Sequence, residues 1–95
     1  MDKVVQEQLA NIPNRHELLS ALLYTSQNEW EKAHEIAQKK EGNLDYDKIH
    51  ALLHRIEGDE FNAKYWYGRI NKTYAEHSIN QEWNILTTSY LAKYS

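Results

Sequence analysis

Residues 49–70 read IHALLHRIEGDEFNAKYWYGRI and contain two apolar stripes at helical spacing. The first stripe consists of Ile49, Leu52, Leu53 and Ile56, and the second of Ala63, Trp66, Tyr67 and Ile70. Between the stripes stands Gly58-Asp59, where the glycine can adopt the left-handed conformation that ends a helix and the aspartate can cap the next helix. This stretch therefore predicts two helices that fold back on each other as a hairpin.

The rest of the chain continues this pattern, because it contains only one Pro and one further Gly as breakers. We expect one all-α domain over residues 1–95, with five or six short helices and no sheet. The predicted helix N-caps are Asp2, Asn14, Asn28, Asp45, Asp59 and Ser78. The last helix, predicted over residues 78–94, is expected to close the core.

A shift of the sequence by 30 residues aligns Ala21-Leu22-Leu23 with Ala51-Leu52-Leu53, and Ala33 with Ala63. The same shift places Asn28 on Gly58, so the two expected turns also correspond. The segments 15–41 and 45–71 are therefore candidates for a repeated helical hairpin. A small Ala at matching positions lets neighbouring helices approach closely.

Two resemblances follow from these residues. Gly58-Asp59, Ala63 and the cluster Tyr65-Trp66-Tyr67 resemble the second half of a tetratricopeptide repeat, which implies stacked antiparallel hairpins over residues 16–71. The period of 30 departs from the usual 34 residues of that repeat. Residues 28–70 are similar to a family of small uncharacterised, mainly bacterial proteins with the pattern HAxLHRxEGDxxNAxYWY, and this resemblance implies no activity.

Composition excludes several classes of function. With 14 acidic and 11 basic residues the net charge is −3, whereas nucleic-acid binding favours a basic surface, so no nucleic-acid partner is expected. No apolar run approaches a membrane span, and the first residues lack the apolar stretch of a secretory signal, so we expect a cytoplasmic protein without a membrane partner. The chain has no Cys, which excludes disulfides and every thiolate-based metal site.

His50 and His54 are four residues apart, which places both imidazoles on one face of a helix, and Glu57 continues that face. His34 can join them if its helix packs antiparallel against theirs. One hypothesis is therefore a metal-dependent enzyme or metal sensor with His34, His50, His54 and Glu57 as ligands. The alternative is that these histidines are half-buried, hydrogen-bonded groups beside the Leu53 stripe.

The hypothesis that we favour from the sequence is a binding or protein-interaction module rather than an enzyme, because no nucleophile or catalytic motif is present. Its expected face consists of His50, His54, Arg55, Glu57, Asn62 and Tyr65. The partner would be an unknown protein, a peptide or a small ligand, and no cofactor is expected. Arg55 and Asn62 could instead serve only the turn, and the Tyr-rich last helix could supply a homodimer contact.

Overall fold

The computed structural model describes residues 1–95 as six α-helices and one 3-10 helix without any strand, which confirms the all-α prediction. The elements in chain order are α1 (Lys3–Ala10), α2 (Glu17–Ser26), α3 (Trp30–Ala37), η1 (Gln38–Lys40), α4 (Leu44–Ile56), α5 (Glu60–Arg69) and α6 (Ile79–Tyr94). No helix combines the length and the apolar character that a membrane crossing requires.

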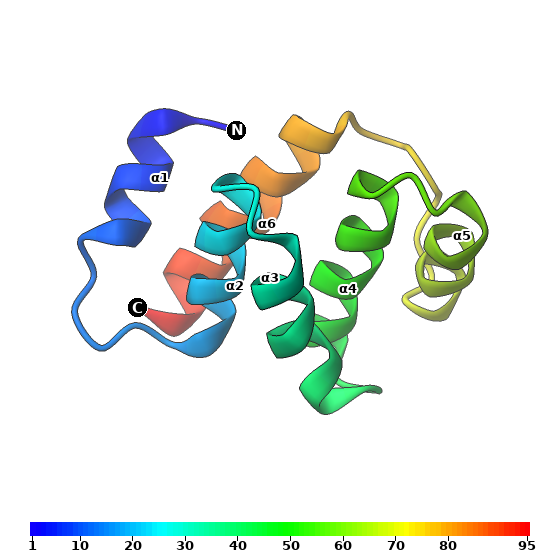
Figure 1. Ribbon diagram of the computed structural model, residues 1–95, viewed down its shortest axis with the longest axis horizontal. Helices are drawn as coiled ribbons and strands as arrows, with labels where there is room; N and C mark the ends of the chain where they lie inside the picture. Colours follow the sequence, from blue (N-terminus) through cyan, green and yellow to red (C-terminus); the bar gives the residue numbers. More distant parts are fainter.

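The helices α2, α3, α4 and α5 lie side by side in chain order, while α6 crosses behind them against α2 and α4 (Figure 1). Helix α1 packs on α2 and α6 at one end of the molecule, and α5 packs on α4 at the other end. Short connections make each neighbouring pair a hairpin. Helices α3 and α4 are therefore the central pair whose facing sides can form a site.

The turns of the α2–α3 and α4–α5 hairpins have the same construction. Each has a left-handed residue at its tip: Asn28 with φ 60° in the first turn and Gly58 with φ 82° in the second. The next backbone N–H donates to the carbonyl five residues earlier, from Glu29 to Tyr24 (2.9 Å) and from Asp59 to His54 (3.0 Å). The two turns that align at an offset of 30 residues in the sequence therefore also share the same backbone conformation.

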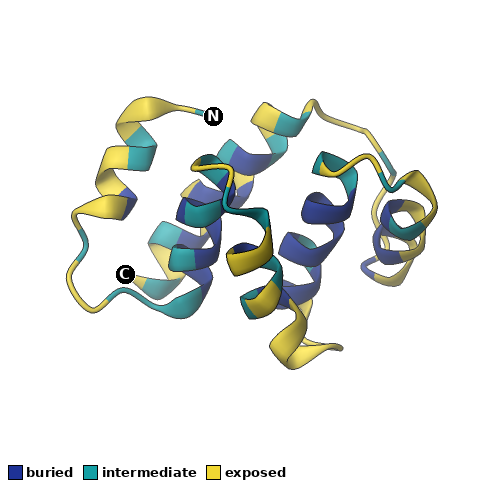
Figure 2. Cartoon of the chain, in the orientation of Figure 1, coloured by how far each residue is buried: buried dark blue, intermediate teal, exposed yellow.

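The core is largest where α2, α4 and α6 meet, as the dark blue residues in Figure 2 show. Trp83 is fully buried there, and its indole N–H donates to the Leu22 carbonyl (2.9 Å). Tyr90 is also buried, and its hydroxyl donates to the Asp45 carbonyl (2.8 Å). A smaller cluster, which includes Ala51, Ala63 and Trp66, joins α4 to α5. The indole N–H of Trp83 and the hydroxyl of Tyr90 therefore both have backbone partners within the core.

The N-caps are only partly those expected. Side-chain bonds from Asp2, Asp59 and Ser78 cap α1, α5 and α6 as predicted. The structure contradicts the other three caps: His16 caps α2 and Asn43 caps α4, while the Glu29 cap position of α3 has no side-chain bond. Asn14 and Asn28 instead take left-handed backbone conformations, with φ of 51° and 60°. Asparagine is favoured in both roles, because its short amide can bond to local backbone in either one.

Candidate metal centre

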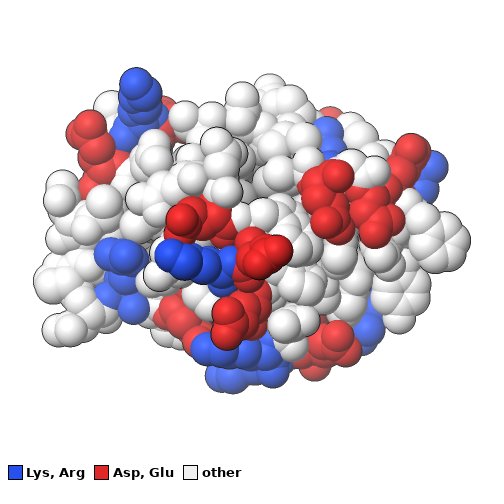
Figure 3. Space-filling view, in the orientation of Figure 1, with Lys and Arg blue, Asp and Glu red and all other residues white.

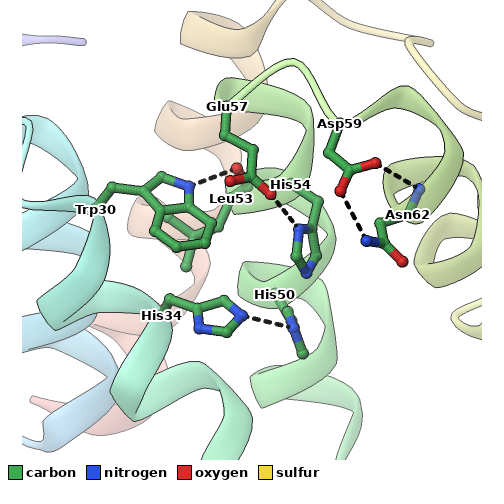
Figure 4. Close-up of polar contacts among 8 residues, drawn as sticks. All are labelled: Trp30, His34, His50, Leu53, His54, Glu57, Asp59 and Asn62. Atoms are coloured by element: carbon green, nitrogen blue, oxygen red, sulfur yellow. Dashed lines mark hydrogen bonds and ion pairs between the residues drawn. The ribbon is translucent and has the colours of Figure 1, made fainter.

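Three histidine side chains converge between α3 and α4 (Figure 4). His34 comes from α3, whereas His50 and His54 come from successive turns of α4. Their ring centroids are separated by 4.8 Å (His34–His50), 5.3 Å (His34–His54) and 4.8 Å (His50–His54). One ring nitrogen from each histidine lies within 4.8 Å of the other two. His34 thus lies next to the pair on the following helix, which is the arrangement that the metal hypothesis from the sequence requires.

The local fold explains why these side chains meet. The 3-10 turn after α3 and the left-handed Gly42 (φ 92°) reverse the chain, so that α4 runs back along α3. On α4 the spacing of four residues then places His50 and His54 one above the other on the side that faces α3. His34 lies on the last turn of α3, level with both.

His34 and His50 share a hydrogen bond between their Nε2 atoms (3.1 Å), so one of these two nitrogens donates and the other accepts. The second ring nitrogen of His50, Nδ1, is buried and has no partner. The His50 side chain as a whole is only 4% exposed. Leaving a buried polar atom unpaired costs about 1–3 kcal/mol. The burial of His50 therefore carries an energetic cost, although its other ring nitrogen is bonded to His34.

His54 differs from His50, because both its ring nitrogens have a defined role. Its Nδ1 bonds to the Glu57 carboxylate (2.7 Å), and a carboxylate accepts, so Nδ1 carries the proton. Nε2 is then the lone-pair nitrogen, and it points toward the other two histidines (Figure 4). A carboxylate that orients a ligand imidazole in this way is a recurrent feature of protein metal sites. Glu57 thus supports the site from outside the triad.

The environment favours the uncharged form of His34 and His50 at neutral pH. Burial, together with the neighbouring His34, His54 and Arg69, lowers the pKa of His50 to about 4. Burial likewise lowers the pKa of His34, and the neighbouring His54 adds to this effect. Neutral imidazoles carry the free lone pair that a metal ion needs.

Two indole rings cover the sides of the histidine triad. Trp30 stacks on His34 with centroids 4.6 Å apart and an interplanar angle of 11°. Trp66 of α5 stacks on His50 at 4.1 Å and 28°. The indole N–H of Trp30 donates to the Leu53 carbonyl (2.7 Å), which fixes that ring against α4. From the sequence alone Trp66 is placed only on an apolar stripe, and the spacing of four between Trp30 and His34 is the signal that their rings meet.

The six residues expected to form one binding face are not arranged on one exposed surface. His50 and His54 are buried, whereas Tyr65 on α5 is 54% exposed. Arg55 points to α6, where its guanidinium pairs with Glu82 (3.2 Å). That carboxylate also accepts from the Tyr67 hydroxyl (2.5 Å). Arg55 therefore belongs to a mostly buried network between α4, α5 and α6.

The other two of the six, Asn62 and Glu57, lie at the α4–α5 turn. The Asp59 carboxylate accepts from the Asn62 backbone N–H (3.2 Å) and from its side-chain amide (2.7 Å). Ligand atoms of His54, Glu57 and Asp59 also lie within 4.8 Å of one another. Their carboxylates are already engaged with His54 and Asn62, so this second group serves the turn and the orientation of His54.

The distances suit a transition-metal ion. Nitrogen ligands at 2.0–2.1 Å in tetrahedral geometry lie roughly 3.3 Å from one another. The His34–His50 nitrogen separation of 3.1 Å is already close to that value, and the whole set lies within 4.8 Å. A small rotation of the imidazole side chains would bring all three nitrogens to one ion.

No family model, curated protein or solved structure matches this chain. The resemblances to tetratricopeptide repeats and to the small bacterial family therefore stay predictions, and the function has to be inferred from the site itself.

Proposed function

We propose that this protein binds a divalent transition-metal ion through His34, His50 and His54. The observation that supports this proposal is the convergence of three imidazoles from two helices on one point. An isolated pair at a spacing of four residues is common on helices. A third histidine from the neighbouring helix, level with the pair, is the arrangement that a metal ion requires.

The cost of the cluster without a metal supports the same proposal. Three apolar side chains would pack between α3 and α4 without needing any polar partner, whereas the imidazoles place polar nitrogens between these helices, with the Nε2 atoms of His34 and His50 3.1 Å apart. A bound ion would stabilise the cluster through its bonds to the imidazole nitrogens. Glu57 would hold His54 in the correct tautomer, so its part in the site is to orient a ligand rather than to be one.

The charge distribution around the site also favours a cation. Figure 3 shows acidic side chains on this face over α3 and over the α4–α5 turn, with basic side chains among them. In the second of these regions the Glu57 carboxylate bonds to His54 Nδ1 (2.7 Å, Figure 4). Surface carboxylates raise the local concentration of cations and so speed the arrival of a metal ion. Three imidazole nitrogens without any thiolate suit Zn²⁺, Cu²⁺, Ni²⁺ or Co²⁺ rather than Mg²⁺ or Ca²⁺.

Calorimetric titration of the untagged protein with Zn²⁺, supported by elemental analysis, tests the proposal. We expect one ion per chain, and a loss of at least 100-fold in affinity when His34, His50 and His54 are replaced together by Asn. The matched control is the double variant H16N/H77N, which removes the two histidines outside the triad. Asn is itself a good N-cap, so it can take over the capping bond of His16.

Two results would contradict the proposal. One is the absence of stoichiometric zinc binding by a folded chain. The other is equal zinc affinity in the triad variant and in wild type. Circular dichroism of each variant checks that the helices remain, so that a loss of binding is not a loss of fold.

A second candidate function, binding of a protein or peptide, is favoured by the exposed aromatic rings of α5. Phe61 is 85% exposed and Tyr65, one turn later, is 54% exposed. We expect the double variant F61S/Y65S to lose partners that wild type captures, while its zinc titration is unchanged. Capture of the same partners by this variant would count against α5 as the binding face. A homodimer through α6 stays a prediction.

A further inference from the structure

We infer that the ion held by His34, His50 and His54 keeps one coordination position for an exogenous ligand, and that this ligand is a small monovalent anion such as hydroxide or azide. The inference rests on the proposed function and goes beyond it. It distinguishes a reactive centre, which keeps an open position, from a structural centre, which is closed by four protein ligands.

The first step is a count of donors. A tetrahedral ion needs a fourth ligand beyond the three imidazoles. The chain has no Cys, and its two remaining histidines, His16 and His77, belong to the start of α2 and the loop before α6. The nearest carboxylates are those of Glu57, engaged with His54, and Asp59, engaged with Asn62. No uncommitted side chain of the protein is therefore placed to complete the shell.

The second step concerns charge. Three imidazoles are neutral ligands, so the ion keeps its full double charge inside its first shell. The site is partly buried, and a charge in such an environment attracts an opposite charge more strongly than it does in water. Glu57 offsets part of the charge from outside, through the imidazole of His54. An anionic fourth ligand is therefore favoured over a neutral one.

The third step limits the size of that ligand. The indoles of Trp30 and Trp66 lie flat against His34 and His50, with centroid separations of 4.6 Å and 4.1 Å. None of the hollows in the protein surface is lined by any of the three histidines. Of the three histidines only His34 is half-buried while the other two are buried, so a small ligand would approach from the His34 side. The Glu57 carboxylate, 2.7 Å from His54 Nδ1, repels a multiply charged anion more strongly than a monovalent one, so phosphate is disfavoured on both size and charge.

Azide titration of the copper-loaded, untagged protein tests the inference. Copper binding is measured first, by calorimetry and by the nitrogen hyperfine pattern in electron paramagnetic resonance. We then expect azide to produce a saturable charge-transfer band with one azide per copper. Phosphate at tenfold higher concentration should neither produce a spectral change nor displace the azide. The control variant H16N/H77N, which lacks the two histidines outside the triad, should bind azide as wild type does.

The outcomes separate the two proposals. If copper binds to the triad but azide leaves the spectrum unchanged, the fourth position is closed and the inference is wrong. If azide binds to copper in the variant E57Q but not in wild type, Glu57 is itself the fourth ligand. That result also overturns the inference, while the metal proposal stands. If copper does not bind to the triad, both proposals fail together.

Discussion

Replacement of His50 by Leu is expected to make the metal-free protein more stable. His50 is 4% exposed, and its unpaired Nδ1 carries a penalty of about 1–3 kcal/mol that Leu would remove. The substitution also loses the hydrogen bond to His34, about 1 kcal/mol, and the stacking on Trp66, about 1 kcal/mol. These losses roughly cancel the first gain. The additional apolar burial of Leu then leaves a net gain of about 1 kcal/mol.

A gain of this size corresponds to a rise in Tm of about 4–8 °C for a domain of this length. The assay is thermal and urea unfolding, followed by circular dichroism in the presence of a chelator and then with excess Zn²⁺. Wild type should gain about 2.7 kcal/mol from zinc at 100 times Kd, whereas H50L should gain little. We therefore expect H50L to be more stable than wild type without metal, but to gain less stability than wild type when zinc is added.

Thr87 offers a matched control, because its Oγ1 is the other buried side-chain atom without a partner. It lies on α6, and the residue is fully buried. The variant T87V should stabilise the metal-free protein by about 1 kcal/mol and keep the full zinc effect. If H50L lowers the stability of the metal-free protein by 1 kcal/mol or more while T87V behaves as expected, His50 is a structural residue and the reasoning about its unpaired nitrogen is wrong.

Three further predictions concern the fold. Burial raises the pKa of Asp45, but two hydrogen bonds from α6 side chains outweigh burial and hold that pKa below its usual value. The carboxylate therefore stabilises the fold above about pH 4, and this contribution is lost as the pH falls further. Between about pH 5 and pH 2, the urea midpoint of D45N should therefore decline less than that of wild type. The variant Y67F should cost about 1.5–3 kcal/mol in urea unfolding, because Tyr67 is 2% exposed and donates to a carboxylate of α6; a neutral result would contradict this. G58A should destabilise the protein by about 1 kcal/mol, because Gly58 has φ 82°. G68A, inside α5, should stabilise the protein by about 0.5–1 kcal/mol, and equal effects of the two variants on Tm would refute this assignment.

Much of the arrangement around the histidines follows from local periodicity. The spacing of His50 and His54 places them on one face of a helix, and the short connection between α3 and α4 brings His34 to that face. The two hairpin turns are also predictable, because matching residues recur after 30 positions and the same backbone bonds form in both turns.

Other features depend on tertiary contacts that a single sequence does not reveal. Arg55 lies close to the predicted site in the sequence, but its partner Glu82 is 27 residues away on α6. Glu57 has the spacing of a ligand and equally that of a partner for His54, and only the 2.7 Å bond to Nδ1 distinguishes the two roles. The stacking of Trp66 on His50 requires the α4–α5 packing itself. Side-chain partners across helices are thus less predictable than helix faces.

X-ray absorption spectroscopy of the zinc-loaded, untagged protein tests the central proposal most directly, because it reports the ligands of the ion rather than an effect of its binding. The account predicts three imidazole nitrogens at about 2.0 Å, seen through the multiple scattering of the rings, with one additional light ligand. The H16N/H77N control should give the same spectrum. A first shell with fewer than three imidazoles, or one of oxygen ligands only, would contradict it.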